Sequence, residues 1–269
     1  MPIKKDETGK RWVEMELSVP GTPEQVWQAI ATGPGYTAWF TPTAIDGRVG
    51  GALRFDMGEN GESNGEVTLW EPPFRFGYVE RDWAEGAPSL ATEITVTARS
   101  GNRCIVRMVH SLFASTDDWD DQIEGFESGW PGFFEVLRLY LSLFSGEKAA
   151  VSAAMARVEA PQLDVWKRLV DGLGLVGANA GETRTASRTP EQLSGVVERV
   201  QQSDTERYML LRLTQPSPGI ALIGTYGIGD ATSAGITLYL YGDDAGQRVA
   251  EGAPGWKDWL RETVGQAAH

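Results

Sequence analysis

Three side chains that could move protons or anchor a polar group stand on predicted strands in the first half of the chain. Tyr78 and Glu80 are two residues apart in the run Arg75–Trp83, and His110 lies near the end of the run Arg103–Leu112. Because alternate residues of a strand share one face, Tyr78 and Glu80 point the same way. A hydroxyl, a carboxyl and an imidazole suit acid–base catalysis, and they equally suit the orientation of a bound ligand.

Apolar and aromatic residues accompany these three groups. Val106 and Met108 share the predicted face of His110, and a helical pattern over Trp130–Phe144 repeats apolar residues at the spacing of one helix face. We expect a pocket between this helix and the sheet. The predicted ligand-binding residues are Trp39, Phe55, Phe76, Tyr78, Glu80, Val106, Met108, His110, Phe133, Phe134 and Leu137.

The same residues also suit an ordinary core, because a helix laid across a sheet needs apolar packing whether or not a ligand is bound. A lone His110 without a paired Cys, Ser or metal ligand is not a catalytic unit, so it is predicted to be a hydrogen-bonded structural histidine and no catalytic residue is assigned. With two histidines in the chain, a multi-histidine metal centre is not expected. No cofactor is expected either.

Two further motifs are interpreted as structural. The glycines of Gly172–Gly177 match the dinucleotide-binding spacing, but they follow a helical run at Leu163–Val170 instead of opening a helix, so they predict a helix stop. The acidic run Asp117–Asp121 lacks the alternating ligands and the glycine of a calcium loop, so it predicts a solvated loop before the last helix.

Composition places the chain among ordinary soluble globular proteins. It has 269 residues, of which 41% are hydrophobic and 23% charged, and its net charge of -13 disfavours nucleic-acid or anionic-membrane partners. The single cysteine, Cys104, excludes an internal disulfide and suits a reducing compartment. The first residues lack the apolar segment of a signal peptide, so a cytoplasmic location is expected.

The order of elements predicts two α+β domains. Arg11–Val19 alternates, with Val13, Met15, Leu17 and Val19 on one face, which is typical of a strand with one buried side. A helix from Pro23, stopped by Gly33-Pro34-Gly35, a series of strands and the helix of Trp130–Phe144 complete residues 1–146. After a boundary at Ser145–Val151, residues 152–269 repeat the strand–helix–sheet–helix plan in a smaller, degenerate form.

A string of short motifs carries a resemblance to a known family. The pieces are Pro20, Val26-Trp27, Trp39-Phe40, Gly50-Gly51, Gly65-Glu66-Val67, Glu71-Pro72-Pro73, His110-Ser111 and Gly129-Trp130. Over Trp12–Phe144 the chain resembles the activator of heat-shock-chaperone ATPase homologue family, within the START/SRPBCC (birch-pollen-allergen-like) superfamily. Cys104 departs from the usual Thr, and the second half has no counterpart in single-domain members. The resemblance implies a helix-grip fold, in which a curved antiparallel sheet wraps a long C-terminal helix.

Three functions stay open at this point. The first is binding of a small apolar or amphipathic ligand in a cavity between the sheet and the long helix. The second, suggested by the family name, is a protein-interaction module that acts on a chaperone. The third is an enzyme of the cyclase or hydrolase sort with Glu80, Tyr78 and His110 as acid–base groups. The second domain is expected to support the first or a homodimer.

Overall fold

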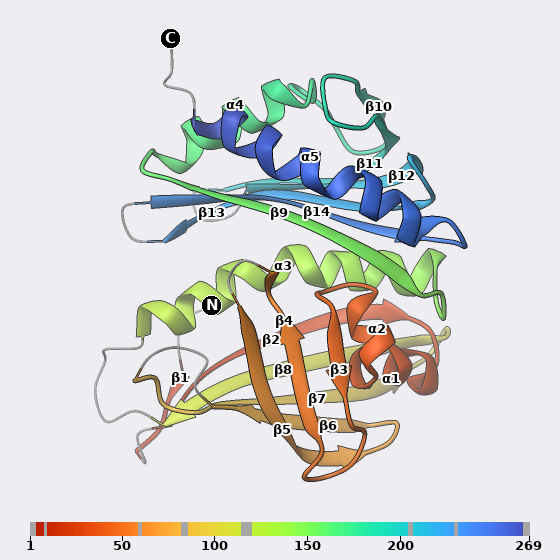
Figure 1. Cartoon of the computed structure of the whole chain (residues 1–269). Coiled ribbons are helices and arrows are strands. Elements are labelled where there is room, and N and C mark those ends of the chain that lie inside the picture. The colour runs from red at the N-terminus through yellow and green to blue at the C-terminus, as the bar shows by residue number, and fades with distance from the viewer. Residues whose placement is uncertain are drawn as a thin grey trace. The chain divides into compact units, whose positions relative to one another are not determined.

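The computed structural model describes residues 4–7, 10–58, 61–81, 86–113, 120–203, 207–228 and 231–265, without the side chains of 113, 120–128 and 228. The chain divides into two compact units, residues 1–148 and 149–269 (Figure 1). Each unit consists of one antiparallel sheet with helices on one face, so the α+β expectation for the fold class is confirmed.

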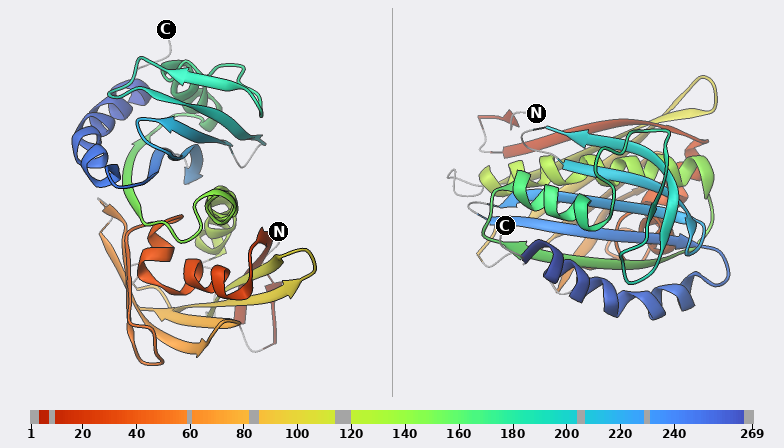
Figure 2. Two further views of the ribbon diagram at one scale, coloured as in Figure 1. Left: turned by 90° about the vertical axis from the view of Figure 1, so that its right-hand side faces the viewer. Right: turned by 90° about the horizontal axis from the view of Figure 1, so that it is seen from above.

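The first unit is an eight-stranded sheet in the order β1-β2-β8-β7-β6-β5-β4-β3. Its strands are β1 (Lys4–Lys5), β2 (Lys10–Pro20), β3 (Thr43–Ile45), β4 (Ala52–Asp56), β5 (Glu62–Glu71), β6 (Arg75–Glu80), β7 (Leu90–Arg99) and β8 (Arg103–Phe113). Its helices are α1 (Pro23–Ala31), α2 (Gly33–Thr37) and α3 (Asp120–Leu143). The sheet curves around α3, which is seen nearly end-on in the left view of Figure 2 and packs along β2. This is the predicted helix-grip arrangement.

The connection between β2 and β3 contains two helices where the sequence predicted one. Thr22 caps α1 in a capping box with Gln25: the Gln25 N–H donates to the Thr22 hydroxyl at 3.3 Å, and the Thr22 N–H donates to the Gln25 side chain at 2.9 Å. At the predicted stop, the Thr32 hydroxyl accepts a hydrogen bond from Gly35 N at 3.1 Å and starts α2. The glycine-rich stop is therefore itself a short helix.

Helix α3 begins ten residues before the predicted Trp130, so the prediction of its start was wrong. Pro131 lies inside the helix, and Asp120 and Asp121, predicted to be in a loop, form its first residues. Acidic side chains in a first turn interact favourably with the helix dipole, which is consistent with a start at this point. The rest of the predicted acidic loop, Asp117–Trp119, lies outside the described residues.

The second unit repeats this plan with fewer strands. It contains β9 (Ala149–Val158), α4 (Gln162–Gly172), β10 (Thr183–Ala186), β11 (Leu193–Gln202), β12 (Arg207–Gln215), β13 (Gly219–Ile228), β14 (Ala231–Tyr241) and α5 (Ala245–Gly265). The sheet order is β10-β11-β12-β13-β14-β9, so the first strand pairs with the last, as β2 pairs with β8 in the first unit. The predicted degenerate repeat is thus present in the topology. Strand β10 was not predicted.

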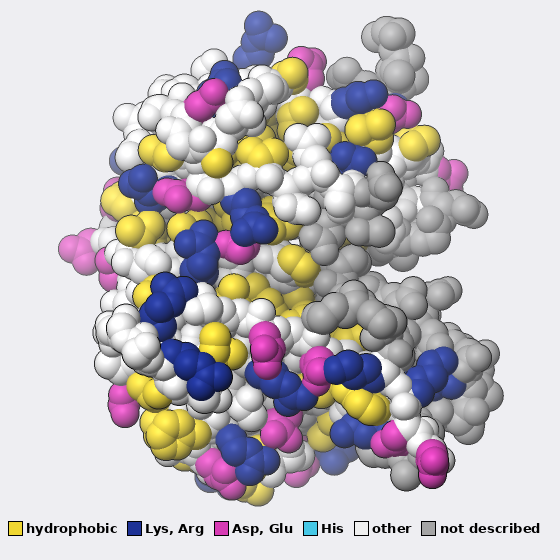
Figure 3. All heavy atoms as spheres, turned by 180° about the vertical axis from the view of Figure 1, so that it is seen from behind, with side chains coloured by type: hydrophobic (Ala, Val, Ile, Leu, Met, Phe, Trp, Pro, Cys, Tyr) yellow, Lys and Arg dark blue, Asp and Glu magenta, His cyan; other side chains and the backbone are white. Residues whose placement is uncertain are grey.

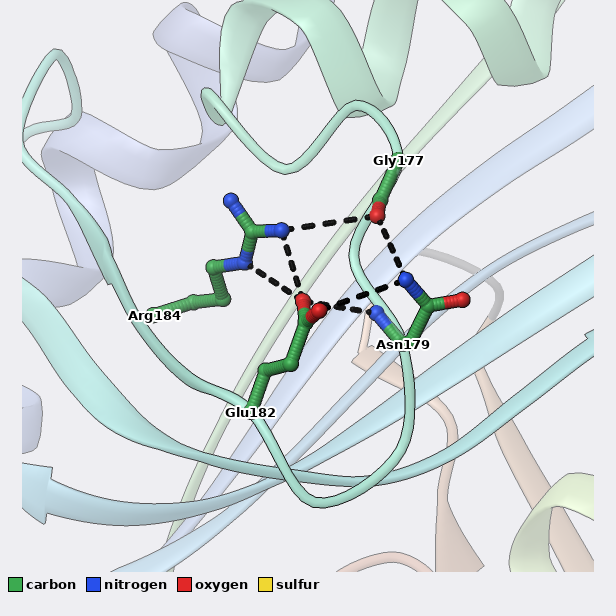
Figure 4. A network of polar contacts seen from close by, with 4 residues as sticks. All are labelled: Gly177, Asn179, Glu182 and Arg184. Carbon is green, nitrogen blue, oxygen red and sulfur yellow. Dashed lines mark hydrogen bonds and ion pairs between the residues drawn. The ribbon is translucent and has the colours of Figure 1, made fainter.

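The glycine motif after α4 ends a helix, as predicted. The N–H groups of Leu173 and Gly174 bond back to the carbonyls of Leu169 and Asp171, and Gly174 adopts a φ of +68°. In the loop that follows, the Glu182 carboxylate accepts hydrogen bonds from Asn179 N at 3.0 Å and from the Arg184 guanidinium at 2.6 Å (Figure 4).

The surface of the chain carries charges of both signs. On the face shown in Figure 3, Lys and Arg side chains are interspersed with Asp and Glu side chains. Exposed ion pairs such as Arg54–Glu62 at 3.0 Å and Arg75–Glu71 at 3.1 Å contribute to this mixture. Among the helices of the described residues, none has the length and apolar character needed to cross a bilayer.

Candidate functional site

A row of polar side chains crosses the inner face of the first sheet. Tyr78 on β6 is the register partner of Thr92 on β7, and Thr92 is the partner of His110 on β8. All three residues are at most 2% exposed. The structure thus brings together two of the three predicted anchors and adds Thr92, which the sequence analysis did not select.

His110 is held as a neutral imidazole. The Thr92 hydroxyl lies 2.8 Å from its Nδ1 atom, and the ring stacks on Trp130 with centroids 5.3 Å apart. Burial lowers the pKa of His110 to about 3. An imidazole with this pKa is almost entirely unprotonated near neutral pH, so its imidazolium form is too rare to serve as a general acid there. The predicted hydrogen-bonded structural histidine agrees with this environment.

Tyr78 lies beside a second buried tyrosine, Tyr36 of α2. Burial raises the pKa of both phenols, and each hydroxyl influences the other. Tyr36 is fully buried, stacks on Trp39 at 4.9 Å and meets Phe55 edge-to-face at 5.3 Å. The Tyr78 hydroxyl is near enough to lower the pKa of Tyr36 through a hydrogen bond, and the described residues offer the Tyr36 hydroxyl no other partner.

Glu80 lies one row further along β6, on the same face as Tyr78. It is 8% exposed, and the Ser63 hydroxyl on β5 donates a hydrogen bond to its carboxylate. Burial raises the pKa of Glu80, and among the described residues no Lys or Arg forms an ion pair with it. Burial thus makes the Glu80 carboxyl easier to protonate than an exposed one, and when protonated it both donates and accepts hydrogen bonds.

Aromatic side chains surround this polar row. Phe55 and Phe76 contact Tyr78 with centroids 5.7 and 5.4 Å apart, and Trp39 lies 6.5 Å from Phe134 of α3. Of the remaining predicted site residues, Val106, Met108 and Leu137 are buried in the same interior and Phe133 is half-buried at its edge. The eleven predicted residues thus lie in one region, between the sheet and α3.

Two residues that the sequence analysis did not assign to the site complete a stack from the edge of this interior to the polar row. Phe40, which is half-buried, stacks on Trp130 at 4.8 Å, and Trp130 stacks on His110 at 5.3 Å. Phe133 meets Phe40 edge-to-face at 4.9 Å. Trp39-Phe40 and Gly129-Trp130 were both part of the motif string, so a signal for these residues was present in the sequence.

These contacts line the interior between the sheet and α3 with aromatic and apolar side chains. Two surface pockets of the described residues lie elsewhere: one of about 320 Å³ at Phe74, Arg75 and Thr95–Ala98, and one of about 450 Å³ in the second unit. None of the eleven predicted residues lines either pocket. Among the described residues, no group of three or more His, Cys, Asp or Glu side chains is arranged to hold a metal ion.

The fold and the interior can now be compared with known proteins. The family model described as "Activator of Hsp90 ATPase homolog 1-like protein" matches residues 20–142, which span α1 to α3. The first unit is therefore similar to this family over residues 20–142. The resemblance expected from the motif string is thereby confirmed for the first unit. No curated protein matches the chain.

Solved structures are similar to one or both units. Protein MLL2253 from Mesorhizobium loti is 25% identical and covers 49% of this chain and 97% of its own, with a TM-score of 0.44. The Aha1 dimer from Colwellia psychrerythraea is 22% identical over 50% of this chain and 98% of its own, with a TM-score of 0.42. DynU16, from the dynemicin biosynthetic locus, is 15% identical over 94% of this chain and 97% of its own, with a TM-score of 0.44.

Proposed function

We propose that the first unit binds a small apolar or amphipathic molecule between the sheet and α3, with the polar end of the molecule toward Tyr36, Tyr78 and Glu80. The observation that carries this proposal is the Tyr36 hydroxyl, which is fully buried and lacks a well-aligned hydrogen-bond partner among the described residues. An unsatisfied buried hydroxyl costs roughly 1–3 kcal/mol, which a polar ligand atom would recover.

The surrounding chemistry defines the class of molecule. The aromatic side chains of Trp39, Phe55 and Phe76 favour an apolar, planar body, while the buried Glu80 carboxyl and the Tyr78 hydroxyl suit an uncharged polar group. A charged ligand group would find no compensating ion among these side chains, so its burial would be costly.

Entry requires movement of the stacked aromatic residues. Phe40 and Phe133 are half-buried and contact each other, and Trp130 lies directly behind Phe40. Rotation of Phe40 and Phe133 would expose Trp130 and open a route toward His110 and Thr92. Exposed residues rotate on fast timescales, but a displacement of Trp130 would slow ligand association.

The test begins with native mass spectrometry of the freshly purified full chain, which detects a co-purified molecule. Binding of that molecule, or of 1-anilinonaphthalene-8-sulfonate and neutral naphthols if none is found, is then measured for the wild type, Tyr78→Phe and Glu80→Gln. Tyr78→Phe removes one hydrogen-bonding hydroxyl, so we expect affinity to fall about three- to tenfold, and Glu80→Gln exchanges the carboxyl for an amide with different donor positions, so we expect a smaller fall. Tyr226→Phe, in the second unit, is the matched control and should bind as the wild type does.

Two results would count against the proposal. One is the absence of saturable binding by every compound. The other is equal affinity of wild type, Tyr78→Phe and Glu80→Gln, because a ligand that ignores both groups does not occupy the interior described above.

A further inference from the structure

The second unit contains a pocket that the proposed function does not involve. Its volume is about 450 Å³, within the usual range of roughly 300–1,000 Å³ for small-molecule sites. Three segments of the second unit form it: the loop before β11, the end of β12 and the first half of α5. The lining residues are Pro190, Glu191, Gln192, Gln215, Pro216, Arg248, Glu251 and Gly252, and we call this region the α5 pocket.

One wall of the α5 pocket is fixed by close packing of Glu191 against α5. A Cβ atom on Gly252 would meet the Glu191 Oε1 atom at 2.3 Å, so the absence of a side chain at this position allows the contact. The indole Nε1 of Trp256, which is 1% exposed, donates a hydrogen bond to the same Oε1 atom at 2.8 Å. The second oxygen of Glu191 has no partner within the described residues.

The positively charged guanidinium of Arg248 is also held in place by hydrogen bonds. Arg248 donates from Nε to Asp244 Oδ2 at 3.3 Å, and the hydroxyl of the buried Ser217 lies 3.1 Å from Asp244 Oδ1. Arg248 and Glu251 are three positions apart on α5 and therefore share a face. Within the described part of the chain, the two terminal nitrogens of Arg248 make no hydrogen bond, which leaves a planar pair of donors for a ligand.

The combination of charges selects the kind of ligand. A simple anion would meet Arg248 but also two carboxylates on a chain with a net charge of -13, and a simple cation would meet the carboxylates but also the guanidinium. A molecule with both charges satisfies all three groups. We propose that the α5 pocket binds a small zwitterion, whose carboxylate pairs with Arg248 and whose ammonium group pairs with Glu191 and Glu251.

The indole N–H of Trp256 can report ligand binding in the α5 pocket. Because its indole N–H bonds to Glu191, a ligand ammonium at Glu191 should shift the Trp256 indole resonance in proton–nitrogen correlation spectra of the full chain. The probes are the common L-amino acids, with sodium acetate as an anion-only control and tetramethylammonium as a cation-only control. We expect a saturable shift with at least one amino acid and none with either control ion.

Variants test the assigned roles. Arg248→Gln should weaken binding about tenfold or more, since a charge-assisted pair is lost. Glu191→Gln should also weaken it, while its amide oxygen still accepts the Trp256 N–H and preserves the wall. Arg261→Gln, on the same helix outside the pocket, is the matched control and should leave affinity unchanged.

The proposal is overturned if no amino acid shifts the Trp256 resonance saturably. It is also overturned if acetate or tetramethylammonium binds as tightly as the amino acid, or if Arg248→Gln retains wild-type affinity. Because the reporter and the variants all lie in the second unit, these outcomes are independent of ligand binding by the first unit.

Discussion

The buried imidazole of His110 should make the first unit less stable in mild acid. In the unfolded chain His110 has an ordinary pKa of 6.5, whereas in the native protein its pKa is about 3. Below pH 6.5 the unfolded state therefore binds a proton that the native state does not. Stability is fully present above pH 6.5, is lost progressively as the pH falls, and levels off near pH 3.

The size of this effect follows from the two pKa values. Each pH unit within the window removes about 1.4 kcal/mol, so the loss of unfolding free energy attributable to His110 is about 2 kcal/mol at pH 5 and about 4 kcal/mol at pH 3. Other groups titrate in the same range, including the carboxylates of Glu14 and Asp244, whose pKa values are lowered by hydrogen bonds to neighbouring side chains. A His110→Gln variant retains a side chain able to bond to Thr92 but does not titrate.

The assay compares the free energy of unfolding of wild type and His110→Gln from pH 8 to pH 4. It uses urea and hydrogen exchange in peptides from β7 and β8, so that the first unit is observed. The wild type should lose about 2 kcal/mol more than the variant between pH 8 and pH 5. Equal losses would refute the reasoning, as would an imidazole resonance of His110 that titrates near pH 6.5 in the native protein.

Three further predictions concern stability, measured by urea unfolding of the full chain with hydrogen exchange in the affected unit. Leu137→Ala should lower the free energy of unfolding by about 3 kcal/mol, because Leu137 is fully buried. Leu143→Ala on the same helix should change it little, because Leu143 is 47% exposed. Equal losses in the two variants would contradict the placement of α3. Thr22→Ala should lower the free energy of unfolding by about 1 kcal/mol, because the capping box is lost. Thr22→Ser keeps the capping hydroxyl and should not lower it, so equal losses in the two variants would argue against the cap. Gly35→Ala should lower the free energy of unfolding by about 3 kcal/mol or more, because its Cβ atom would lie 1.8 Å from the Gln28 carbonyl oxygen. Gly246→Ala is the control, because no atom lies within 4 Å of a Cβ atom at that position. A Gly35→Ala protein as stable as the wild type would show that Gly35 does not approach Gln28 this closely.

The strands of the first unit could be predicted from the sequence because each buries one face. In β2 the predicted inner residues Val13, Met15 and Val19 are 2%, 6% and 0% exposed, and the period of two that reveals them results directly from the difference between core and solvent. The same logic placed His110 and Met108 on one inner face of β8. Alternation along one strand needs no knowledge of its neighbours.

The start of α3 and the partners of the polar row could not be predicted in this way. The acidic residues at the start of α3 suit a solvated loop as well as a helix N-terminus, and glycines and Pro131 weaken the helical pattern further. Thr92 meets Tyr78 and His110 only because of the register among β6, β7 and β8, and a shift by one residue would turn its side chain to the other face.

The repeated plan of the two units separates what the fold needs from what a site needs. In the second unit the corresponding inner row runs through Met209, Ile223, Ile236 and Ala154 on β12, β13, β14 and β9, and all four residues are buried and apolar. The topology is therefore satisfied by an apolar row.

In the first unit the equivalent strands place Tyr78, Thr92 and His110 in that position, followed by Val13 of β2. Buried polar groups stabilise a core only when they are fully hydrogen-bonded, and an apolar row of similar volume serves packing at least as well. The helix-grip plan does not require these polar side chains, and the ligand site proposed above would give them a role beside the buried Tyr36 hydroxyl.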